Sequence, residues 1–166
     1  MLFFDLMKGM AEIDRMKKAY ELQIKKAMKI GITEALRQVT ISTPVDTGRA
    51  RWGWYLSVKV PSTEVPPEGK YKTPQIAEKL QAVNENFTVK DTLFLTNNVP
   101  YIKRLNNGSS KQAPARFVEK SAEIAQQAVY RWLKQPNTFA EAAKEFGTDI
   151  RARKGAVKLS QNKKRS

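Results

Sequence analysis

The chain contains neither cysteine nor histidine, and both absences narrow what it can do. Without cysteine it forms no disulfide and offers no thiolate, which fits assembly in a reducing cytosol. Without histidine it has no Ser-His-Asp or Cys-His arrangement and no imidazole metal ligand. Carboxylate-only or lysine-based catalysis stays open, so these absences argue against an enzyme without excluding one.

Long hydrophobic runs are also missing. No run of eighteen apolar residues occurs, so no segment is predicted to span a membrane. The apolar first ten residues lack a basic leader and a small-residue cleavage site, which argues against a signal peptide. No glycine-rich phosphate loop and no paired carboxylates are evident, so we predict no catalytic residue, no metal site and no cofactor.

What the sequence does have is apolar residues and positive charge. Its 166 residues are 41% apolar, enough for one domain with a single core. Thirty Lys and Arg against sixteen Asp and Glu give a net charge of +14. Such a field favours a polyanionic neighbour or an acidic protein surface. A solvated basic surface that keeps the protein soluble is the alternative, and both stay open.

Apolar residues recur at steps of three and four from residue 10 to about residue 42, which predicts one long helix. Pro44 ends it, because the residue before a proline is pushed out of the helical region. At 1.5 Å per residue the helix is on the order of 45 Å long, so we expect part of it to pack on a neighbouring subunit. The predicted apolar face consists of Ile13, Met16, Tyr20, Ile24, Ala27, Gly31, Ala35 and Val39.

Alternating apolar residues predict a first strand over 52–60, and the run at 92–96 predicts a second. Trp52 and Trp54 would share one strand face as core or interface anchors rather than as a platform for stacked bases. Proline-rich residues 61–72 read as an extended surface loop.

Four further segments have the residue pattern of helices or helical turns. A short helix opens at Thr73 or Pro74, a helical turn covers 100–105, and further helices cover 115–134 and 139–146. This order predicts an α+β fold, with a small antiparallel sheet packed with a long N-terminal helix and a long C-terminal helix.

A folded domain is predicted over residues 1–148 and a basic, flexible tail over 149–166. The tail would contact DNA or an acidic partner, or would simply solubilise the terminus. Its cations are Arg151, Arg153, Lys154, Lys158, Lys163, Lys164 and Arg165.

Two stretches form a recognisable pair. The first is Thr-Pro-Val-Asp-Thr-Gly-Arg-Ala-Arg over 43–51, between a helix and a strand; the second is Asn-Asn-Val-Pro-Tyr-Ile-Lys-Arg-Leu-Asn-Asn-Gly over 97–108, followed by Ala-Pro-Ala-Arg-Phe-Val over 113–118. In order and spacing they resemble the tail-completion and neck proteins of long-tailed phages, over residues 10–135. The long insertion at 61–86 and the tail after Gly147 depart from that pattern.

The resemblance implies a non-enzymatic structural virion protein, located in the neck or tail and assembled in the host cytoplasm. It implies a homo-oligomeric ring of six or twelve copies. The ring's partners would be a portal- or adaptor-side connector protein and a tail tube or tail terminator protein. Genomic DNA would pass in contact with it, and no membrane is involved.

The motif residues have candidate roles. Asp46 would accept backbone N–H bonds and Gly48 would reverse the chain, while Tyr101 would bury its ring and pair its hydroxyl with the backbone. Arg49 and Arg51 would point outward to a neighbour's carboxylate. The full set, for subunit contact or for holding the fold alone, is Asp46, Thr47, Gly48, Arg49, Arg51, Tyr101, Arg104 and Gly108.

Two other functions compete with a ring subunit. A basic nucleic-acid-binding protein is supported by charge alone, since no helix-turn-helix, zinc site or aromatic RNA-binding signature is present. A small enzyme such as a nuclease would have to work without histidine. For the ring subunit, we expect the proline-rich loop, the basic tail or both to become ordered only against neighbouring proteins.

Overall fold

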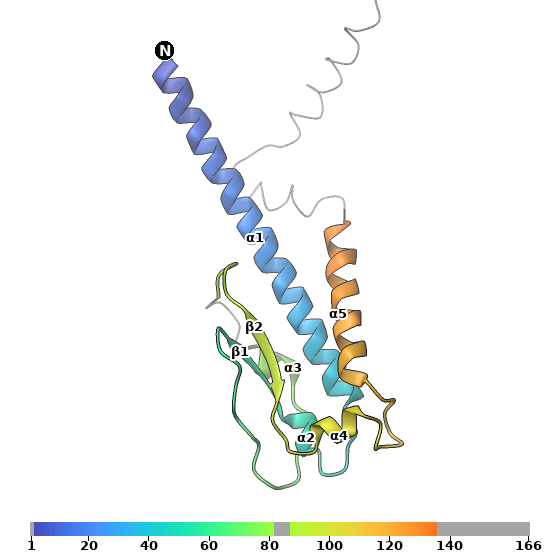
Figure 1. Ribbon diagram of the computed structural model, residues 1–166. Coiled ribbons are helices and arrows are strands. Elements are labelled where there is room, and N and C mark those ends of the chain that lie inside the picture. The colour runs from blue at the N-terminus through green and yellow to red at the C-terminus, as the bar shows by residue number, and fades with distance from the viewer. Residues whose placement is uncertain (1, 82–86, 136–166) are drawn as a thin grey trace, which may run out of the picture. The chain divides into compact units, whose positions relative to one another are not determined.

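A computed structural model describes residues 2–81 and 87–135, with side chains from Met7 onward (Figure 1). The chain divides into two compact units, one of residues 27–132 and one of residues 1–26 with 133–166. None of the helices within the described ranges is long and apolar enough to cross a membrane. In chain order the elements are α1 (Leu2–Ser42), α2 (Arg49–Trp52), β1 (Trp54–Val58), α3 (Ile76–Leu80), β2 (Leu93–Asn97), α4 (Ile102–Asn106) and α5 (Phe117–Leu133).

Helix α1 ends where Pro44 predicts, at Ser42, but it begins at Leu2 and not near residue 10. Its end is tied to the sheet through Thr43. The Thr43 amide and hydroxyl both donate to the carbonyl of Val39, and the indole N–H of Trp54 donates to the Thr43 hydroxyl at 2.9 Å. These bonds satisfy polar groups that would otherwise be buried without partners.

The predicted apolar face of α1 is wrong in part. Val39 is buried, but Ile13 and Ile24 are exposed, while Leu36, which that face left out, is fully buried. The core contacts made by α1 come from Met28, Ile32, Leu36 and Val39. Spacing alone could not identify this face, because it is set by where the sheet and α5 pack.

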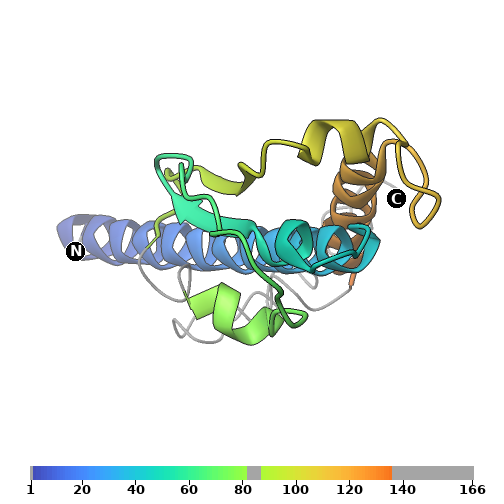
Figure 2. The same cartoon turned by 90° about the horizontal axis from the view of Figure 1, so that it is seen from below.

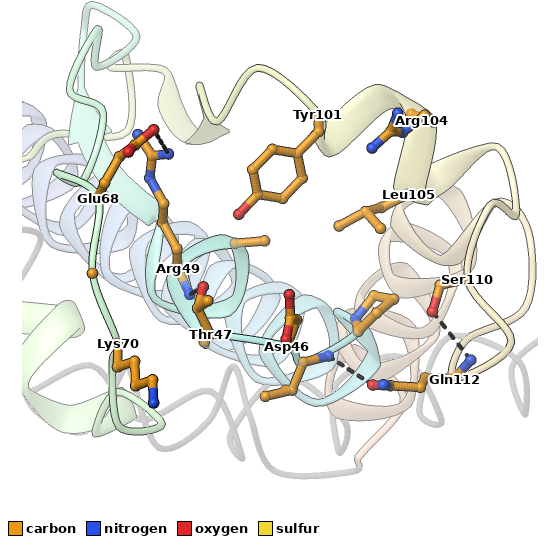
Figure 3. Close-up of a pocket in the computed structure, with 15 residues that line it drawn as sticks. Asp46, Thr47, Arg49, Glu68, Lys70, Tyr101, Arg104, Leu105, Ser110 and Gln112 are labelled. Carbon is orange, nitrogen blue, oxygen red and sulfur yellow. Dashed lines mark hydrogen bonds and ion pairs between the residues drawn. The ribbon is translucent and has the colours of Figure 1, made fainter.

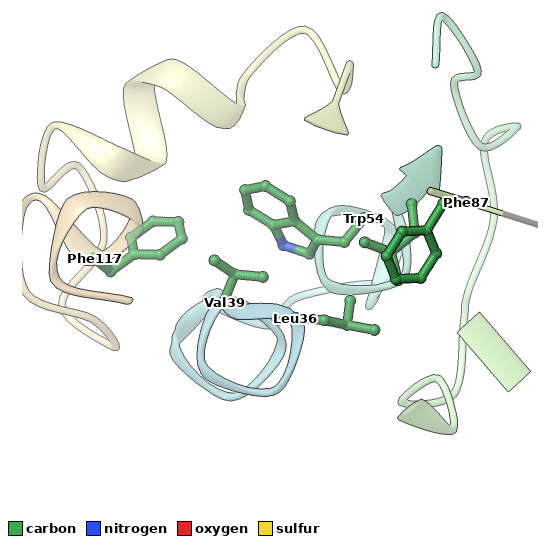
Figure 4. Close-up of a cluster of buried hydrophobic side chains, with 6 residues drawn as sticks. Leu36, Val39, Trp54, Phe87 and Phe117 are labelled. Carbon is green, nitrogen blue, oxygen red and sulfur yellow. The ribbon is translucent and has the colours of Figure 1, made fainter. Parts of the chain in front are cut away.

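Strands β1 and β2 form a two-stranded antiparallel sheet in which Leu56 lies opposite Leu95. Helices combined with this small antiparallel sheet give the α+β class that the sequence predicts. The core joins Leu36 and Val39 of α1, Trp54 and Leu56 of β1, Phe87, and Phe117 of α5 (Figure 4). Burial of these side chains is the main favourable term for this unit.

The first strand is shorter than predicted, and the two tryptophans do not share its face. Trp52 belongs to α2, whose single turn is closed by bonds of 2.9 Å from the Trp52 amide to the Gly48 carbonyl and from the Gly53 amide to the Arg49 carbonyl. Trp54 lies in the core, whereas Trp52 is half-buried. Residues 49–52 form a helical turn, although the alternating pattern predicted that the strand begins at Trp52. The turn starts directly after the bend because Gly48 adopts a φ of +82°.

Helices α1 and α5 lie side by side within the unit formed by residues 27–132 (Figures 1 and 2). A Cβ atom at Gly31 would come within 3.1 Å of a methyl group of Val129. The missing side chain therefore permits this close approach of the two helices. Buried positions on α5 recur every four residues, at Phe117, Ser121 and Ala125.

The proline-rich loop is held by its own chain. The side-chain amide of Asn98 donates to the carbonyls of Ser62 and Glu64 at 2.8 and 3.0 Å. Pro66 is buried, and the Tyr71 hydroxyl donates to the Pro67 carbonyl at 2.8 Å. The loop therefore has defined partners within the chain, and the expectation that the loop, the basic tail or both become ordered only against neighbouring proteins stays a prediction.

The shorter helices lie close to their predicted places. Helices α3, α4 and α5 begin and end within a few residues of the predictions for 74–83, 100–105 and 115–134. The helix predicted over 139–146 and the boundary between residues 148 and 149 lie outside the described residues.

Candidate functional site

The first motif forms a bend, and two features of this bend require glycine at position 48. Gly48 has a φ of +82°, a region that other residues rarely adopt, and a Cβ atom there would collide with the carbonyl oxygen of Tyr71. The Tyr71 amide donates to the carbonyl of Thr47 at 2.7 Å. The bend therefore forms a docking site for the end of the proline-rich loop.

The two arginines of this motif turn back onto their own chain and do not point outward. The Arg51 guanidinium donates to the Thr43 carbonyl at 2.9 and 3.2 Å and to the Ile41 carbonyl at 3.3 Å. These are carbonyls at the C-terminal end of α1, where helices leave acceptors unsatisfied and where positive charge is favoured. Arg51 thus caps the long helix.

Arg49 fixes the loop. Its Nε donates to the Pro66 carbonyl at 2.9 Å, and one terminal nitrogen pairs with the Glu68 carboxylate at 3.4 Å. The prediction that Arg49 and Arg51 point out of the corner is therefore wrong. Backbone carbonyls, which sequence patterns do not mark, attract both guanidinium groups.

Asp46 does not accept the backbone bonds predicted for it. Instead the Thr47 hydroxyl accepts a bond from the Arg49 amide, at 3.4 Å. The Asp46 carboxylate is exposed and has no hydrogen-bond or ion-pair partner among the described residues. It is thus available to another molecule.

A residue of the second motif, Asn106, holds the N-terminal end of α5. The Asn106 carbonyl accepts from the Arg116 amide at 2.6 Å, and its side-chain oxygen accepts from the Val118 amide at 2.9 Å. Its side-chain amide donates to Glu119 at 2.9 Å. Asn106 therefore caps a helix that begins eleven residues later (117 − 106), a role that sequence analysis missed because the cap is distant in sequence.

Gly108 allows the chain to turn back closely enough for this cap. It has a φ of +89°, and a Cβ atom there would lie 3.0 Å from the Cβ of Ala115. Both features require glycine. The predicted importance of Gly108 thus has a physical cause in the fold.

Both motifs line a single open pocket of about 610 Å³ (Figure 3). Residues 44–50 form one wall, residues 68–70 of the proline-rich loop a second, and Tyr101, Arg104 and Leu105 of the second motif a third. Gln112 closes the gap between the motifs, because its side-chain oxygen accepts from the Val45 amide at 2.9 Å. The two motifs, which are more than fifty residues apart in the chain (101 − 48), therefore meet at one surface.

Several polar groups at this pocket are not used by the fold. Figure 3 shows the Tyr101 hydroxyl and the Asp46 carboxylate directed into the same open space. Neither the Tyr101 hydroxyl nor the Arg104 guanidinium has a partner among residues 2–81 and 87–135, so the predicted backbone bond of Tyr101 is not made. The pocket thus offers an acceptor, a hydroxyl and a cation.

The pocket has mixed charge. Arg49, Lys70 and Arg104 are opposed by Asp46 and Glu68, which leaves a net charge of +1 (3 − 2). Arg49 and Glu68 already neutralise each other. Alternating donors and acceptors of this kind suit a polypeptide that carries charged side chains better than they suit a polyanion alone.

A cluster of aromatic rings stands next to this corner. The Lys79 ammonium of α3 lies 3.8 Å from the Trp52 ring centroid and 4.5 Å from that of Tyr55, and it donates to the Trp52 carbonyl at 2.8 Å. The Tyr71 ring lies 5.3 Å from Trp52. Burial lowers the pKa of Lys79, against a smaller upward effect of Glu64. The cluster fastens α3 and the loop to α2 and β1.

No group of three or more His, Cys, Asp or Glu side chains suited to a metal ion occurs in the described part of the chain. The seven cations predicted for the tail, Arg151 to Arg165, lie outside the described residues.

Comparisons of the chain with models of protein families, with curated proteins and with solved structures gave no match. The resemblance drawn from the two motifs accordingly stays a prediction.

Proposed function

We propose that this chain is a structural subunit of a tailed-phage virion, one copy in a ring that completes the tail or joins it to the head connector. We further propose that its motif pocket, defined as the hollow lined by residues 44–50 and 68–70 and by Tyr101, Arg104, Leu105, Ser110 and Gln112, receives a polypeptide segment of an adjoining subunit. Its partners would be copies of itself, a connector protein on the head side, and a tail tube or terminator protein.

The observation that carries this proposal is the convergence of both motifs on the pocket. Polar side chains that a motif needs only for the fold make their bonds within the chain, whereas exposed groups left to water stay available to another molecule. Gly48, Arg49, Arg51 and Gly108 fit that purely structural role. The acid, hydroxyl and guanidinium that stay unpaired support a second role, contact with another chain.

The framework around the pocket supports assembly into a ring. A helix that ends at the first motif, a strand after it, and a last helix that begins after the second motif follow the order of elements that the resemblance implies. A subunit of this kind can pack side by side through head-to-tail contacts, which close into a ring when the rotation between neighbouring subunits permits it. A ring lumen that carries positive charge would pass DNA through weak, salt-sensitive phosphate contacts.

The test is electron microscopy of particles from a phage that lacks this gene, with purified protein added back. The proposal expects separate DNA-filled heads and unattached tails, which join on add-back. Intact, infectious particles without the protein would overturn it and favour the basic nucleic-acid-binding alternative.

Variants of the pocket sharpen this test. Tyr101→Phe combined with Arg104→Ala removes two unpaired groups and disturbs no bond within the described chain, so we expect a folded protein that joins heads to tails at least tenfold less efficiently. The matched control is Lys103→Ala, an exposed cation on the same helix that does not line the pocket. Full activity of the double variant would remove the pocket from the contact.

A further inference from the structure

The N-terminal part of α1 presents a row of exposed apolar side chains. Met10, Ile13, Tyr20 and Ile24 are exposed by 56, 66, 51 and 47%. Spacings of three, seven and four residues place them on one face of the helix, which we call the α1 stripe, and Lys17 lies on that face in the gap between Ile13 and Tyr20. Ala19, on another face of the same stretch, is fully buried. Single exposed apolar residues are ordinary, but four large ones along one face form a surface suited to packing against a helix.

Charges along the same stretch are separated by sign. Residues 7–14 contain one lysine and two acids, for a net charge of −1 (1 − 2). Residues 15–26 contain five cations and one acid, for a net charge of +4 (5 − 1). Two parallel copies of this helix would bring like charges together, whereas two antiparallel copies would bring opposite charges together.

We propose that α1 pairs antiparallel with α1 of a second copy of this chain, so that the free protein is a two-fold dimer. With the helices crossing near residue 15, Met10 of one copy lies opposite Tyr20 of the other. Glu12 then lies opposite Lys18, and Ile13 lies opposite Lys17, whose charged end extends along the helix pair to solvent. Arg15, at the crossing point, is on the far side of the helix from the α1 stripe, because it is offset by about 180° at 100° per residue. The like charges of Arg15 therefore do not meet.

This inference goes beyond the proposed ring function. A two-fold contact joins identical surfaces and closes at two copies, whereas a ring needs two different surfaces on each subunit. The dimer therefore describes the free protein before assembly. A helix contact as long as the α1 stripe, about 21 Å, makes a small interface, so the dimer should dissociate readily and release subunits for assembly.

Sedimentation velocity on the full chain tests the dimer. We expect a monomer–dimer equilibrium in the micromolar range, and Met10→Lys with Ile13→Lys should weaken it at least tenfold. The matched control is Ile41→Lys, because Ile41 is 59% exposed on the same helix but lies outside the α1 stripe. Equal helical content by circular dichroism would establish that the variants fold. A wild-type chain that stays monomeric at every concentration would overturn the proposal.

Disulfide trapping tests the orientation, because the chain has no cysteine of its own. Chains with Met10→Cys mixed with chains carrying Tyr20→Cys should form a covalent dimer on oxidation. Each variant alone should not, since ten residues separate the two positions by about 15 Å along the helix axis. Efficient cross-linking of either variant with itself, or none in the mixture, would overturn the antiparallel pairing.

The two proposals fail separately. A monomeric chain that still joins heads to tails would overturn the dimer and leave the ring function standing. A dimer that restores no particles would do the reverse.

Discussion

At the scale of the residue, the motif glycines and arginines act on the chain's own backbone. Gly48 leaves room for the Tyr71 carbonyl, and Arg51 covers the last carbonyls of α1. The motif pattern marks these positions as special, but the expectation drawn from it was that Arg49 and Arg51 point outward, with contact to a neighbour and a role in the fold alone both left open. The error has a physical cause, since a guanidinium donates to any well-placed carbonyl and a sequence does not reveal which carbonyls are near.

Gly48→Ala should destabilise the protein strongly. An alanine there adopts a left-handed conformation at a cost of roughly 1–2 kcal/mol, and its methyl group collides with the Tyr71 carbonyl, so the loop must also move. We expect the free energy of unfolding in urea to fall by about 2–4 kcal/mol.

The matched control for that variant is Gly9→Ala. Gly9 lies inside α1, and a methyl group added there would meet no atom within 4 Å. Alanine should therefore leave stability unchanged or raise it by up to about 1 kcal/mol. Equal effects of the two substitutions would show that Gly48 is not constrained as described.

At the scale of the element, α3 is held by Ile76 and Leu80, which pack against the core, and by the side chain of Lys79. Lys79→Met keeps the apolar stem but removes the cation from between Trp52 and Tyr55 and leaves the Trp52 carbonyl without its donor. We expect the free energy of unfolding to fall by about 1–2 kcal/mol, because the cation–π interactions and the hydrogen bond are removed. Tryptophan fluorescence should change as well, since the ammonium lies over the ring.

Lys72→Met is the control for α3, because Lys72 is an exposed lysine of the neighbouring loop and should behave as wild type. Loss of stability in Lys72→Met, or none in Lys79→Met, would contradict the fastening role. Hydrogen exchange of the amides in 76–80 would show the release of α3 directly.

Helices and strands could be predicted from the sequence where the residues that mark them lie within or next to the element. Pro44 marks the end of α1, and the run at 92–96 marks β2 to within one residue. The contacts that join elements were not predictable in this way. The bond between Tyr71 and Thr47 and the cap of α5 by Asn106 connect residues that only the folded chain brings together. The convergence of the two motifs on one pocket likewise exists only in the fold.

At the scale of the whole molecule, the chain carries a large excess of positive charge, with a net charge of +14. Within the described residues the ion pairs include Arg37–Glu34, Arg49–Glu68 and Lys59–Asp91, each with an exposed member and each contributing little to stability. Because each ion pair cancels in the net charge, the whole excess of +14 acts as a long-range field, which guides encounters with acidic partners or DNA without defining a specific site.

Removing the cations of the predicted tail tests what the excess positive charge does. Replacing the seven cations from Arg151 to Arg165 by glutamine lowers the net charge from +14 to +7 (14 − 7). If the tail binds phosphates, binding of the full chain to random-sequence duplex DNA should weaken, and the slope of log K against log salt should become shallower by about 0.9 for each phosphate that is no longer neutralised. Replacing the five lysines at 17, 18, 25, 26 and 29 of α1 is the comparison that locates the effect. A slope unchanged by the tail variant but reduced by the α1 variant would assign DNA binding to the helix, and the tail would then be a solubilising terminus.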